Sequence, residues 1–563
     1  MKERAYKLMK EWCDTMLTFQ VRNSSPYIDG TMLCPACHVL HGRLADLTFP
    51  FTLIWSRTGD ESYLENADLL IEWSEYNLKT PEGVWYNDAG NRWKWTTSFS
   101  CMSLGETLHH FGETLPIKYK EKWTNVYKRL IEALYKMSLW FADVKDKPVN
   151  GKPITNYFCS MAAAMALAWK NLGEQKYYDM AFTWLGYVLE RFDNDGLLFG
   201  EGHANVYDDG SHLIDMGYNL EESFPLLMRF ASITGKYKEF ILEKFRLHTS
   251  FILPDGGIDN SFGSRHNKWT YWGSRTSDGI IEGLAFAMDD PWFVDVARRT
   301  LDLYEKCTHD GLLAMPMAHE VGEPTCLHHT FPHAKALASF ICDAPDDITI
   351  GEPIPAEKYG VRKFQNDKLI QVSHGVFRAT ISAQQAMYIN KAENCGGSLN
   401  LLYVDGYGIA CAATSAYYLP SEPLNQQYLR SAGNTPCMTA QFVVDGNLGC
   451  QDRNVDIVSD GTTVTTTAEK WQAKYAFDEN KLTIDLSCEN GVYNFPIVCS
   501  KNNSVVVSED GHCVTIANVL RIRSNVLLTV DPNERVFNQV GGLLYLPIYV
   551  NVNGKATVTL EKI

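Results

Sequence analysis

Over the first 345 residues, apolar positions recur every three or four residues, which predicts a long succession of helices. Five short connections between them resemble one another, and each ends one helix and opens the next. They lie around Gly59, Gly112, Gly173, Gly235 and Asp290. In four of them a glycine offers the left-handed backbone of a helix C-cap. Successive connections are 53, 61, 62 and 55 residues apart, which indicates a repeated unit of two helices.

The repeat predicts how the helices are arranged in space. Five helix pairs occupy roughly residues 40–307, one helix precedes them at about 2–19, and one follows at about 330–343. If the first and last helices pair, the six hairpins close into a ring, an (α/α)6 toroid. An open solenoid would leave an apolar side of both terminal helices uncovered. We therefore expect a mainly α toroid over residues 1–345.

The pattern changes after the toroid. Residues 346–357 are rich in Pro and Gly and form a predicted linker. Beyond them, apolar and polar residues alternate in short runs separated by Asp-Gly and Asn-Gly pairs, which are typical of hairpin turns. We expect residues 358–563 to form an all-β antiparallel sandwich.

The long connections of such a ring gather at one end, so their composition indicates where function lies. Nine of the fifteen histidines fall in them. These are His38, His41, His203, His212, His266, His319, His328, His329 and His333. The helices that start here also turn their partly positive ends toward this rim, which favours anions. We expect the active site at this rim.

The ring has six predicted long connections between hairpins. The fourth of them, residues 201–223, is the most acidic. Glycoside hydrolysis normally uses two carboxylates, an acid and a base or nucleophile. The predicted catalytic carboxylates are Glu221, Glu222, Asp208, Asp209 and Asp215, with Asp278 or Asp259 across the rim as a further partner. A structural interpretation stays open, because acids near helix starts are often caps and Asp208 and Asp209 precede a glycine in a turn-like sequence.

The fifth long connection carries cations and aromatic residues together. Arg265, Lys268 and Arg275 suit a carboxylate, while Tyr271 and Trp272 offer flat faces to a sugar ring. This combination favours a uronic acid, although a basic loop held by the acidic loop beside it would look the same. Further predicted substrate contacts are Asp278, His38, His41, Arg43, Trp93 and His203, and His266 and Tyr271 are added to the catalytic candidates.

Charge and composition narrow the class of partner. The net charge of −16 argues against nucleic acid, and 14 Trp, 28 Tyr and 26 Phe suit a glycan binder as well as a large core. No apolar run reaches the length of a membrane span, and no signal-peptide pattern begins the chain, so a cytoplasmic location is expected. Fifteen scattered cysteines suit reduced thiols. The oligomeric state stays open, a homo-oligomer included.

Two sequence patterns resemble binding motifs for haem or a metal ion. Cys34-Pro-Ala-Cys37-His38 matches a haem-attachment pattern, but a single copy within a helical repeat argues against haem. The same cysteines with His38 or His41 could hold zinc, and His329 and His333 have the spacing of a helical metal pair, which Pro332 weakens. Nucleotide-binding and serine-hydrolase motifs are not found. We expect no cofactor.

Three segments carry a resemblance to known enzymes: CPACHVLHGR, GYNLEESFPLL and WTYWGSRTSDG. With the toroid-plus-sandwich order, the chain most resembles the β-glucuronidases of glycoside hydrolase family 154. It resembles the heparinase and alginate-lyase type of polysaccharide lyase second. The first resemblance implies that water removes a terminal glucuronic acid.

The lyase resemblance implies β-elimination with Asn, His, Tyr and Arg, for which Asn260, His266, Tyr271 and Arg275 are available. Related lyases also use a histidine from the sandwich, and residues 393–418, the comparable stretch, contain none. This absence favours the hydrolase. The predicted function is therefore a β-glucuronidase-type hydrolase acting on a uronic-acid oligo- or polysaccharide. The alternatives are a uronate lyase and a non-catalytic glycan-binding protein.

Overall fold

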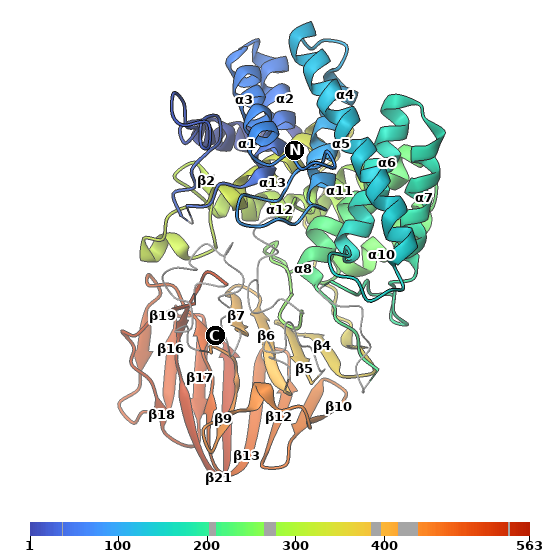
Figure 1. The fold of residues 1–563 in the computed structure, drawn as a ribbon. Coiled ribbons are helices and arrows are strands. Elements are labelled where there is room, and N and C mark those ends of the chain that lie inside the picture. Colours follow the sequence, from blue (N-terminus) through green and yellow to red (C-terminus); the bar gives the residue numbers. More distant parts are fainter. Residues whose placement is uncertain (37, 202–209, 264–276, 384–395, 415–436, 539–540) are drawn as a thin grey trace.

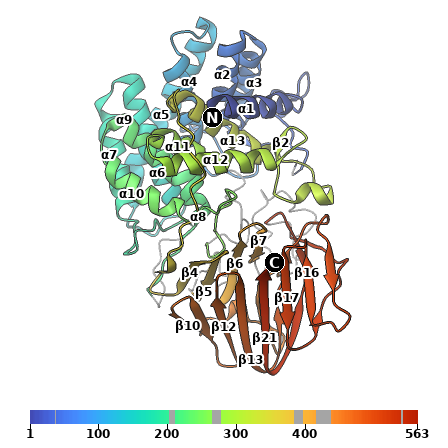
Figure 2. The same ribbon diagram turned by 180° about the vertical axis from the view of Figure 1, so that it is seen from behind.

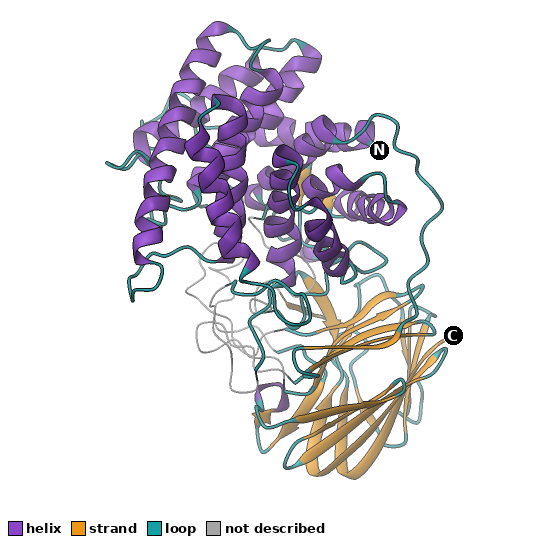
Figure 3. Cartoon of the chain, turned by 90° about the vertical axis from the view of Figure 1, so that its right-hand side faces the viewer, coloured by secondary structure: helices purple, strands orange, loops and turns teal. Residues whose placement is uncertain are grey.

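A helical part and a strand part follow one another along the chain, as the sequence predicts. The computed structural model describes residues 1–563 except 37, 202–209, 264–276, 384–395, 415–436 and 539–540. Figure 1 shows the helices at one end of the molecule and the strands at the other, and Figure 3 shows the same division by type of element. The predicted fold class is confirmed.

The helices of the first part form hairpins around the predicted short connections. The bounds are α1 (Lys2–Leu17), α2 (Thr48–Thr58), α3 (Ser62–Asn77), α4 (Thr97–Phe111), α5 (Ile117–Val144), α6 (Thr155–Leu172), α7 (Gln175–Leu189), α8 (Met216–Tyr218), α9 (Phe224–Thr234), α10 (Lys238–Thr249), α11 (Ile281–Leu284), α12 (Pro291–Lys306) and α13 (Leu327–Asp343). Short 3-10 turns are η1 (Gly42–Leu47), η3 (Ala285–Ala287), η4 (Ala318–Val321) and η5 (Gly449–Gln451), and η2 (Asn219–Ser223) is a π-helical turn.

The capping residues differ from one hairpin to the next. Gly59, Gly173 and Gly235 adopt the left-handed backbone with φ of 74°, 74° and 66°, as predicted. Asp290 caps α12 by accepting a hydrogen bond from the backbone N–H of Trp292 at 2.9 Å. The expectation for Gly112 is wrong. Its φ is −58°, and the helix ends there with ordinary right-handed backbone before Pro116 opens the next one.

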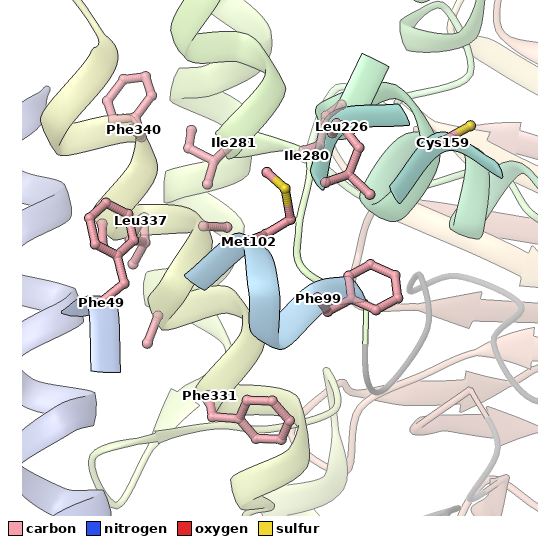
Figure 4. Close-up of a cluster of buried hydrophobic side chains, with 14 of the residues drawn as sticks. Phe49, Phe99, Met102, Cys159, Leu226, Ile280, Ile281, Phe331, Leu337 and Phe340 are labelled. Atoms are coloured by element: carbon pink, nitrogen blue, oxygen red, sulfur yellow. The ribbon is translucent and has the colours of Figure 1, made fainter. Parts of the chain in front are cut away.

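The ring is closed by the two terminal helices. α1 packs against α13, and the inner helices α2, α4, α6, α9, α11 and α13 contact one another in that order, with α13 returning to α2. Apolar side chains from these inner helices meet in the middle of the ring (Figure 4). They include Phe49, Met102, Leu226, Ile281 and Leu337. The centre of the toroid is therefore a packed core, which forms the floor beneath the rim.

The strands of the second part form antiparallel sheets. Five of them pair in the order β3-β4-β5-β6-β7, and the large sheet runs β10-β11-β12-β13-β21-β17-β16-β15 with β8, β9 and β18 alongside; β14-β20-β19 form a third sheet. The bounds are β3 (Gly360–Phe364), β4 (Leu369–His374), β5 (Phe377–Ser382), β6 (Ser398–Val404), β7 (Gly408–Ala412), β8 (Gln441–Val444), β9 (Asn447–Leu448), β10 (Asp456–Asp460), β11 (Thr463–Thr467), β12 (Trp471–Phe477), β13 (Lys481–Asn494), β14 (Ile497–Val498), β15 (Val505–Val507), β16 (Cys513–Ile516), β17 (Leu520–Ser524), β18 (Leu528–Thr529), β19 (Val536–Asn538), β20 (Leu543–Leu546) and β21 (Tyr549–Lys562). In the helical part, β1 (Thr308–His309) pairs with β2 (Leu312–Leu313).

The sheet β3–β7 packs against one side of the rim, and α8 lies between the helices and these strands in both views (Figures 1 and 2). Asp259 accepts hydrogen bonds from Thr380 and from Gln371 of the sheet, the latter at 3.2 Å. Asn400 donates to the backbone oxygen of Ser261 at 2.9 Å. In the described part of the chain, none of the helices combines the length and the apolar character that a membrane crossing requires.

Candidate active site

Arg43 is the central cation of the rim. It lies in η1 and is 3% exposed. Its guanidinium bonds Asp46 at 2.9 Å and Asp278 at closer range, and it lies 4.1 Å above the ring of Phe99. A buried guanidinium that carboxylates hold on both edges cannot move freely. The positive charge of Arg43 is therefore fixed in position at the rim.

A second buried cation, Lys335, completes the charge cluster. Its Nζ lies 2.7 Å from Asp278, and its side chain, on inner helix α13, is fully buried. Burial alone would raise the pKa of Asp278, but Arg43 and Lys335 together hold that pKa below its ordinary value. Asp278 is therefore ionised and engaged by both cations.

Glu222 is the residue of the cluster that keeps its proton. Burial raises its pKa to about 8, against the opposing effect of Arg43, and the amide of Asn156 donates to its Oε2 at 2.6 Å. Arg43 and Lys335 are already matched by Asp46 and Asp278, so a further buried negative charge is unfavourable. At neutral pH Glu222 is therefore largely protonated.

Glu221 faces a different set of partners. It accepts a hydrogen bond from the Ser277 hydroxyl at 2.6 Å, and its other oxygen lies 3.6 Å from His333. The two neighbouring glutamates sit on the π-helical turn η2, where insertion of an extra residue re-aims side chains. Of the pair, Glu222 contacts Asn156, while Glu221 anchors the start of α11 through Ser277.

The first turn of α6 brings Asn156 and Tyr157 to the rim. The Asn156 backbone N–H lies 3.4 Å from Glu201, and the Tyr157 ring lies 5.7 Å from that of Trp93. Burial raises the phenol pKa of Tyr157, and the charges of Glu222 and Glu201 raise it further. The phenol of Tyr157 is therefore neutral and keeps its proton around neutral pH.

A pocket opens on the other side of Trp93. It has a volume of about 740 Å³ and lies among the connections after α3 and α5 and the side of α5. Its lining includes Trp93, Trp95, Trp140, Arg92, Lys94 and Lys136. Lys94 pairs with Glu82 at 2.9 Å, so the pocket carries an excess of positive charge over flat indole faces.

Many of the predicted site residues lie outside the described residues. They are His203, Asp208, Asp209, Arg265, His266, Lys268, Tyr271, Trp272 and Arg275. Both of their segments are bordered by residues of the cluster, since Glu201 directly precedes the first and Ser277 directly follows the second. Their roles stay predictions.

The remaining predicted residues fall into two groups. Arg43, Asp278, Glu222 and Trp93 gather at the rim as described above. Asp215 accepts from the Tyr218 backbone N–H at 3.1 Å, which makes it the N-cap of α8, and from Asn260 at 3.2 Å. Asn260 also accepts from the backbone N–H of Met216 at 2.8 Å.

The histidines are placed less uniformly. His38 is exposed and has a φ of 57°, whereas His41 is buried and caps η1 by accepting from the Arg43 backbone N–H at 3.2 Å. His329 and His333 lie on one helix, α13, because that helix begins before Pro332 rather than at it. The Nδ1 of His333 donates to the His329 carbonyl at 2.6 Å, and its Nε2 lies 3.6 Å from Glu221. Among the described residues, the two histidines do not belong to a group of three converging metal ligands.

Sequence reasoning missed Asn156, Tyr157 and Lys335 as individual residues. Two signals were present. The third long connection contains Thr-Asn-Tyr where a helix begins, and Lys335 is a single charge in the otherwise apolar run of α13. A buried lysine needs a carboxylate partner, and the sequence does not say which one.

Comparison with known proteins gives one consistent answer. Residues 9–352 match the Ulvan lyase N-terminal domain, and residues 361–450 and 452–563 match the Ulvan lyase C-terminal domain. The chain is 31% identical to the "Broad-specificity ulvan lyase" of Formosa agariphila, over 97% of this chain and 91% of that protein.

Solved structures share the fold at low identity. Heparinase III is similar with a TM-score of 0.55 and 12% identity, over 91% of this chain and 75% of that one. The chondroitin AC lyase of Streptomyces coelicolor A3 is similar with a TM-score of 0.54 and 12% identity, over 100% of this chain and 79% of that one.

These matches correct the functional expectation. The β-glucuronidase prediction is wrong, and so is the resemblance to glycoside hydrolase family 154, because both halves of the chain match lyase domains. The second resemblance, to polysaccharide lyases of uronic acid glycans, is confirmed. The hydrolase was favoured because residues 393–418 contain no histidine. That argument fails, since elimination needs a base and a proton donor but does not fix which part of the chain supplies them.

Proposed function

Because the chain belongs to the ulvan lyase family, we propose that it cleaves ulvan, a uronic-acid-containing polysaccharide, by β-elimination. A base removes the C5 proton of the uronic acid, and that electron pair becomes the C4–C5 double bond. The C4–O bond breaks, and its electrons leave with the oxygen, which takes up a proton. Water is not consumed, so the summed mass of the products equals that of the substrate.

The observation that carries the proposal is the Asn156–Glu222 pair beside Arg43. A carboxylate weakens the acidity of the neighbouring C–H, so a lyase must neutralise it. A protonated Glu222 and the Asn156 amide donate to an incoming carboxylate, while Arg43 opposes its charge. Hydrogen-bond donors placed in advance stabilise the negative charge that spreads from C5 onto the carboxylate as the proton leaves.

Tyr157 is the proposed proton donor to the leaving oxygen. Its raised pKa keeps the phenol neutral, so the phenol holds a proton that it can give to the leaving oxygen. It follows Asn156 directly, so one helical turn supplies both the carboxylate contact and the acid. Loss of a positioned acid typically costs about 10²–10⁴-fold in rate.

The base that removes the C5 proton is proposed to be His266, and Tyr271 of the same segment, residues 264–276, is a second candidate. Support comes from the segment's C-terminal border, where Ser277 bonds Glu221 and Asp278 bonds Arg43 and Lys335. The pocket beyond Trp93 is proposed to take the next sugar unit of the chain, with the indoles as stacking faces and Lys136 and Arg92 as anion contacts.

The function is tested by mixing the protein with ulvan and, separately, with an aryl β-glucuronide. We expect a rise in ultraviolet absorbance from the new C4–C5 double bond with ulvan and no release of the phenol. In the variant Tyr157→Phe the rate of that rise falls by at least about 10²-fold. The matched control, Tyr177→Phe on outer helix α7, keeps the rate. Equal rates in the two variants would exclude Tyr157 as the proton donor.

A further inference from the structure

Three potential metal ligands that have no part in the proposed reaction converge at the closure of the ring. The Sγ atoms of Cys34 and Cys326 and a ring nitrogen of His328 all lie within 4.8 Å of one another, and all three residues are buried. Cys34 belongs to the long connection that follows α1, whereas Cys326 caps α13 and His328 lies in its first turn. Segments about 290 residues apart thus bring two thiols and an imidazole together.

The spacing of the two sulfur atoms suits a shared ion. They are 3.7 Å apart, far beyond the roughly 2.05 Å of a disulfide, so the two cysteines are not bonded to each other. Two thiolates on a tetrahedral Zn²⁺, each about 2.3 Å from the metal, stand about 3.8 Å apart. The observed separation matches this value.

We propose that Cys34, Cys326 and His328 bind a structural Zn²⁺ ion. On binding, each thiol releases a proton and the imidazole coordinates in its neutral form, so one Zn²⁺ displaces two protons from the cysteines. Two thiolates with imidazole favour zinc over the harder cations, which prefer oxygen ligands.

The potential ligands also lie close together along each of the two segments. Cys34 begins a C-x-x-C pair whose second member, Cys37, lies outside the described residues, and Cys326 with His328 forms C-x-H. The chain turns tightly here, because the His38 backbone N–H donates to the Cys34 carbonyl at 3.1 Å.

Two other arrangements of potential ligands are less suited to the ion. His41 lies 4.9 Å from the His328 ring, but its Nδ1 accepts from Arg43, so its proton is on Nε2 and neither nitrogen is open. The second cluster of candidate ligands, Glu106, His110 and Asp343, surrounds Arg229, which pairs with Glu106 at 3.0 Å and Asp343 at 2.7 Å. A guanidinium already supplies the positive charge there.

The position of the ion gives it a structural task. It joins the connection leading to Arg43 with the helix that carries Lys335, and both cations hold Asp278. The ring contact between His41 and His328 links the site to the cap of η1. Zinc would therefore fix the two segments that position the charge cluster, without touching substrate.

The test measures zinc in the full-length protein, independently of lyase activity. After incubation with Zn²⁺ and removal of the excess, plasma mass spectrometry is expected to find about one zinc ion per chain. Cys34→Ser and Cys326→Ser should each lower zinc content at least about tenfold. The control Cys342→Ser, also on α13, keeps it. Zinc below about one ion in ten chains of the unaltered protein would overturn the proposal.

A second measurement uses only the unaltered protein, so its result does not depend on whether the variants fold. The unaltered protein is stripped with a chelator and reloaded with Co²⁺ alone. Intense visible bands of tetrahedral Co²⁺ together with ultraviolet thiolate-to-metal charge transfer are expected, and the midpoint of thermal unfolding should fall on stripping and return on reloading. Bound Co²⁺ without thiolate charge transfer would overturn the assignment.

Discussion

At the scale of single residues, Glu222 shows how burial sets chemistry. Glu221 and Glu222 are adjacent and both buried. Of the two, Glu222 accepts a hydrogen bond from Asn156, close to Arg43 and Lys335, and both of these cations already pair with Asp278. Burial raises the pKa of Glu222, and the neighbouring carboxylates Asp278 and Glu201 raise it further. The proposed carboxylate contact depends on the proton that Glu222 retains.

The pH dependence of the reaction tests this proton. The protonated form of Glu222 is the active one, so kcat/KM on ulvan should fall as pH rises through about 8. Glu222→Gln keeps a neutral hydrogen-bond donor and should lose this alkaline fall while retaining measurable turnover. Initial rates between about pH 6 and 10 decide it. An unchanged alkaline fall in Glu222→Gln would contradict the role of Glu222.

The same residue should destabilise the folded protein. In the unfolded chain Glu222 ionises near 4.5, whereas in the folded protein it does so at about 8. Between these values the folded state binds more protons, so stability falls as pH rises from 4.5 to 8 and then levels off. Glu222→Gln should therefore be more stable than the unaltered protein at pH 7 by about 3 kcal/mol at most, and no more stable at pH 4.

Urea unfolding at the two pH values measures this difference. Glu75→Gln, at a partly exposed carboxylate in a surface ion pair, serves as the control and should not show the same gain. A gain of equal size at pH 4 and pH 7 would mean that the substitution acts through packing and not through ionisation.

At the scale of elements, the sequence was informative where local chemistry decides the structure. Connections at Gly59, Gly173 and Gly235 end helices with the predicted left-handed caps, and α1 and α13 pair as the repeat requires. Gly112 does not adopt the predicted left-handed backbone. The helix ends there in the right-handed conformation, and Pro116 then opens the next helix. A glycine indicates that a helix can end there, and the structure decides by which backbone.

The site was harder to predict because its partners come from different hairpins. Arg43, Asp278 and Lys335 lie on η1, at the start of α11 and on α13, and only the closed ring brings them together. The sequence indicated the rim and its charged loops. It could not separate Glu222 from Glu221, since the π-helical turn that directs them apart has no signature in residue type.

The inner helices also carry a buried ion cluster that the ring depends on. Arg229 of α9 pairs with Glu106 of α4 at 3.0 Å and Asp343 of α13 at 2.7 Å. Arg229→Met leaves these carboxylates without their cation and should lower the free energy of unfolding by about 3–5 kcal/mol. Arg57→Met, at a partly exposed arginine 3.6 Å from Glu3, should change it by less than about 1 kcal/mol. Denaturant titration compares the two, and equal losses would contradict a structural role for the buried cluster.

At the scale of the whole molecule, the substrate path is expected to run from the Asn156–Glu222 pair past Trp93 into the pocket. The pocket lies among connections of neighbouring hairpins, so a long chain should reach it whereas a short oligosaccharide should not. The sheet β3–β7 covers another side of the rim and is fastened there through Asp259 and Asn400.

Chain-length dependence tests this path. Lys136→Glu reverses a charge in the pocket and should raise KM for long ulvan chains about fivefold, corresponding to about 1 kcal/mol, with little change in kcat. Lys128→Glu makes the same charge change on an exposed part of α5, outside the pocket lining, and should leave KM nearly unchanged. An equal effect of Lys136→Glu on the shortest cleavable oligosaccharide would place the pocket outside the substrate path.

The most direct test of the central claim is the fate of water during cleavage. The protein is incubated with ulvan in water enriched in ¹⁸O, and the new chain ends are analysed by mass spectrometry. Elimination predicts ends that carry a C4–C5 double bond, and uptake of ¹⁸O at the reducing ends no faster than the spontaneous exchange of a purified product. Incorporation of one ¹⁸O for each bond cleaved, with saturated products, would contradict it.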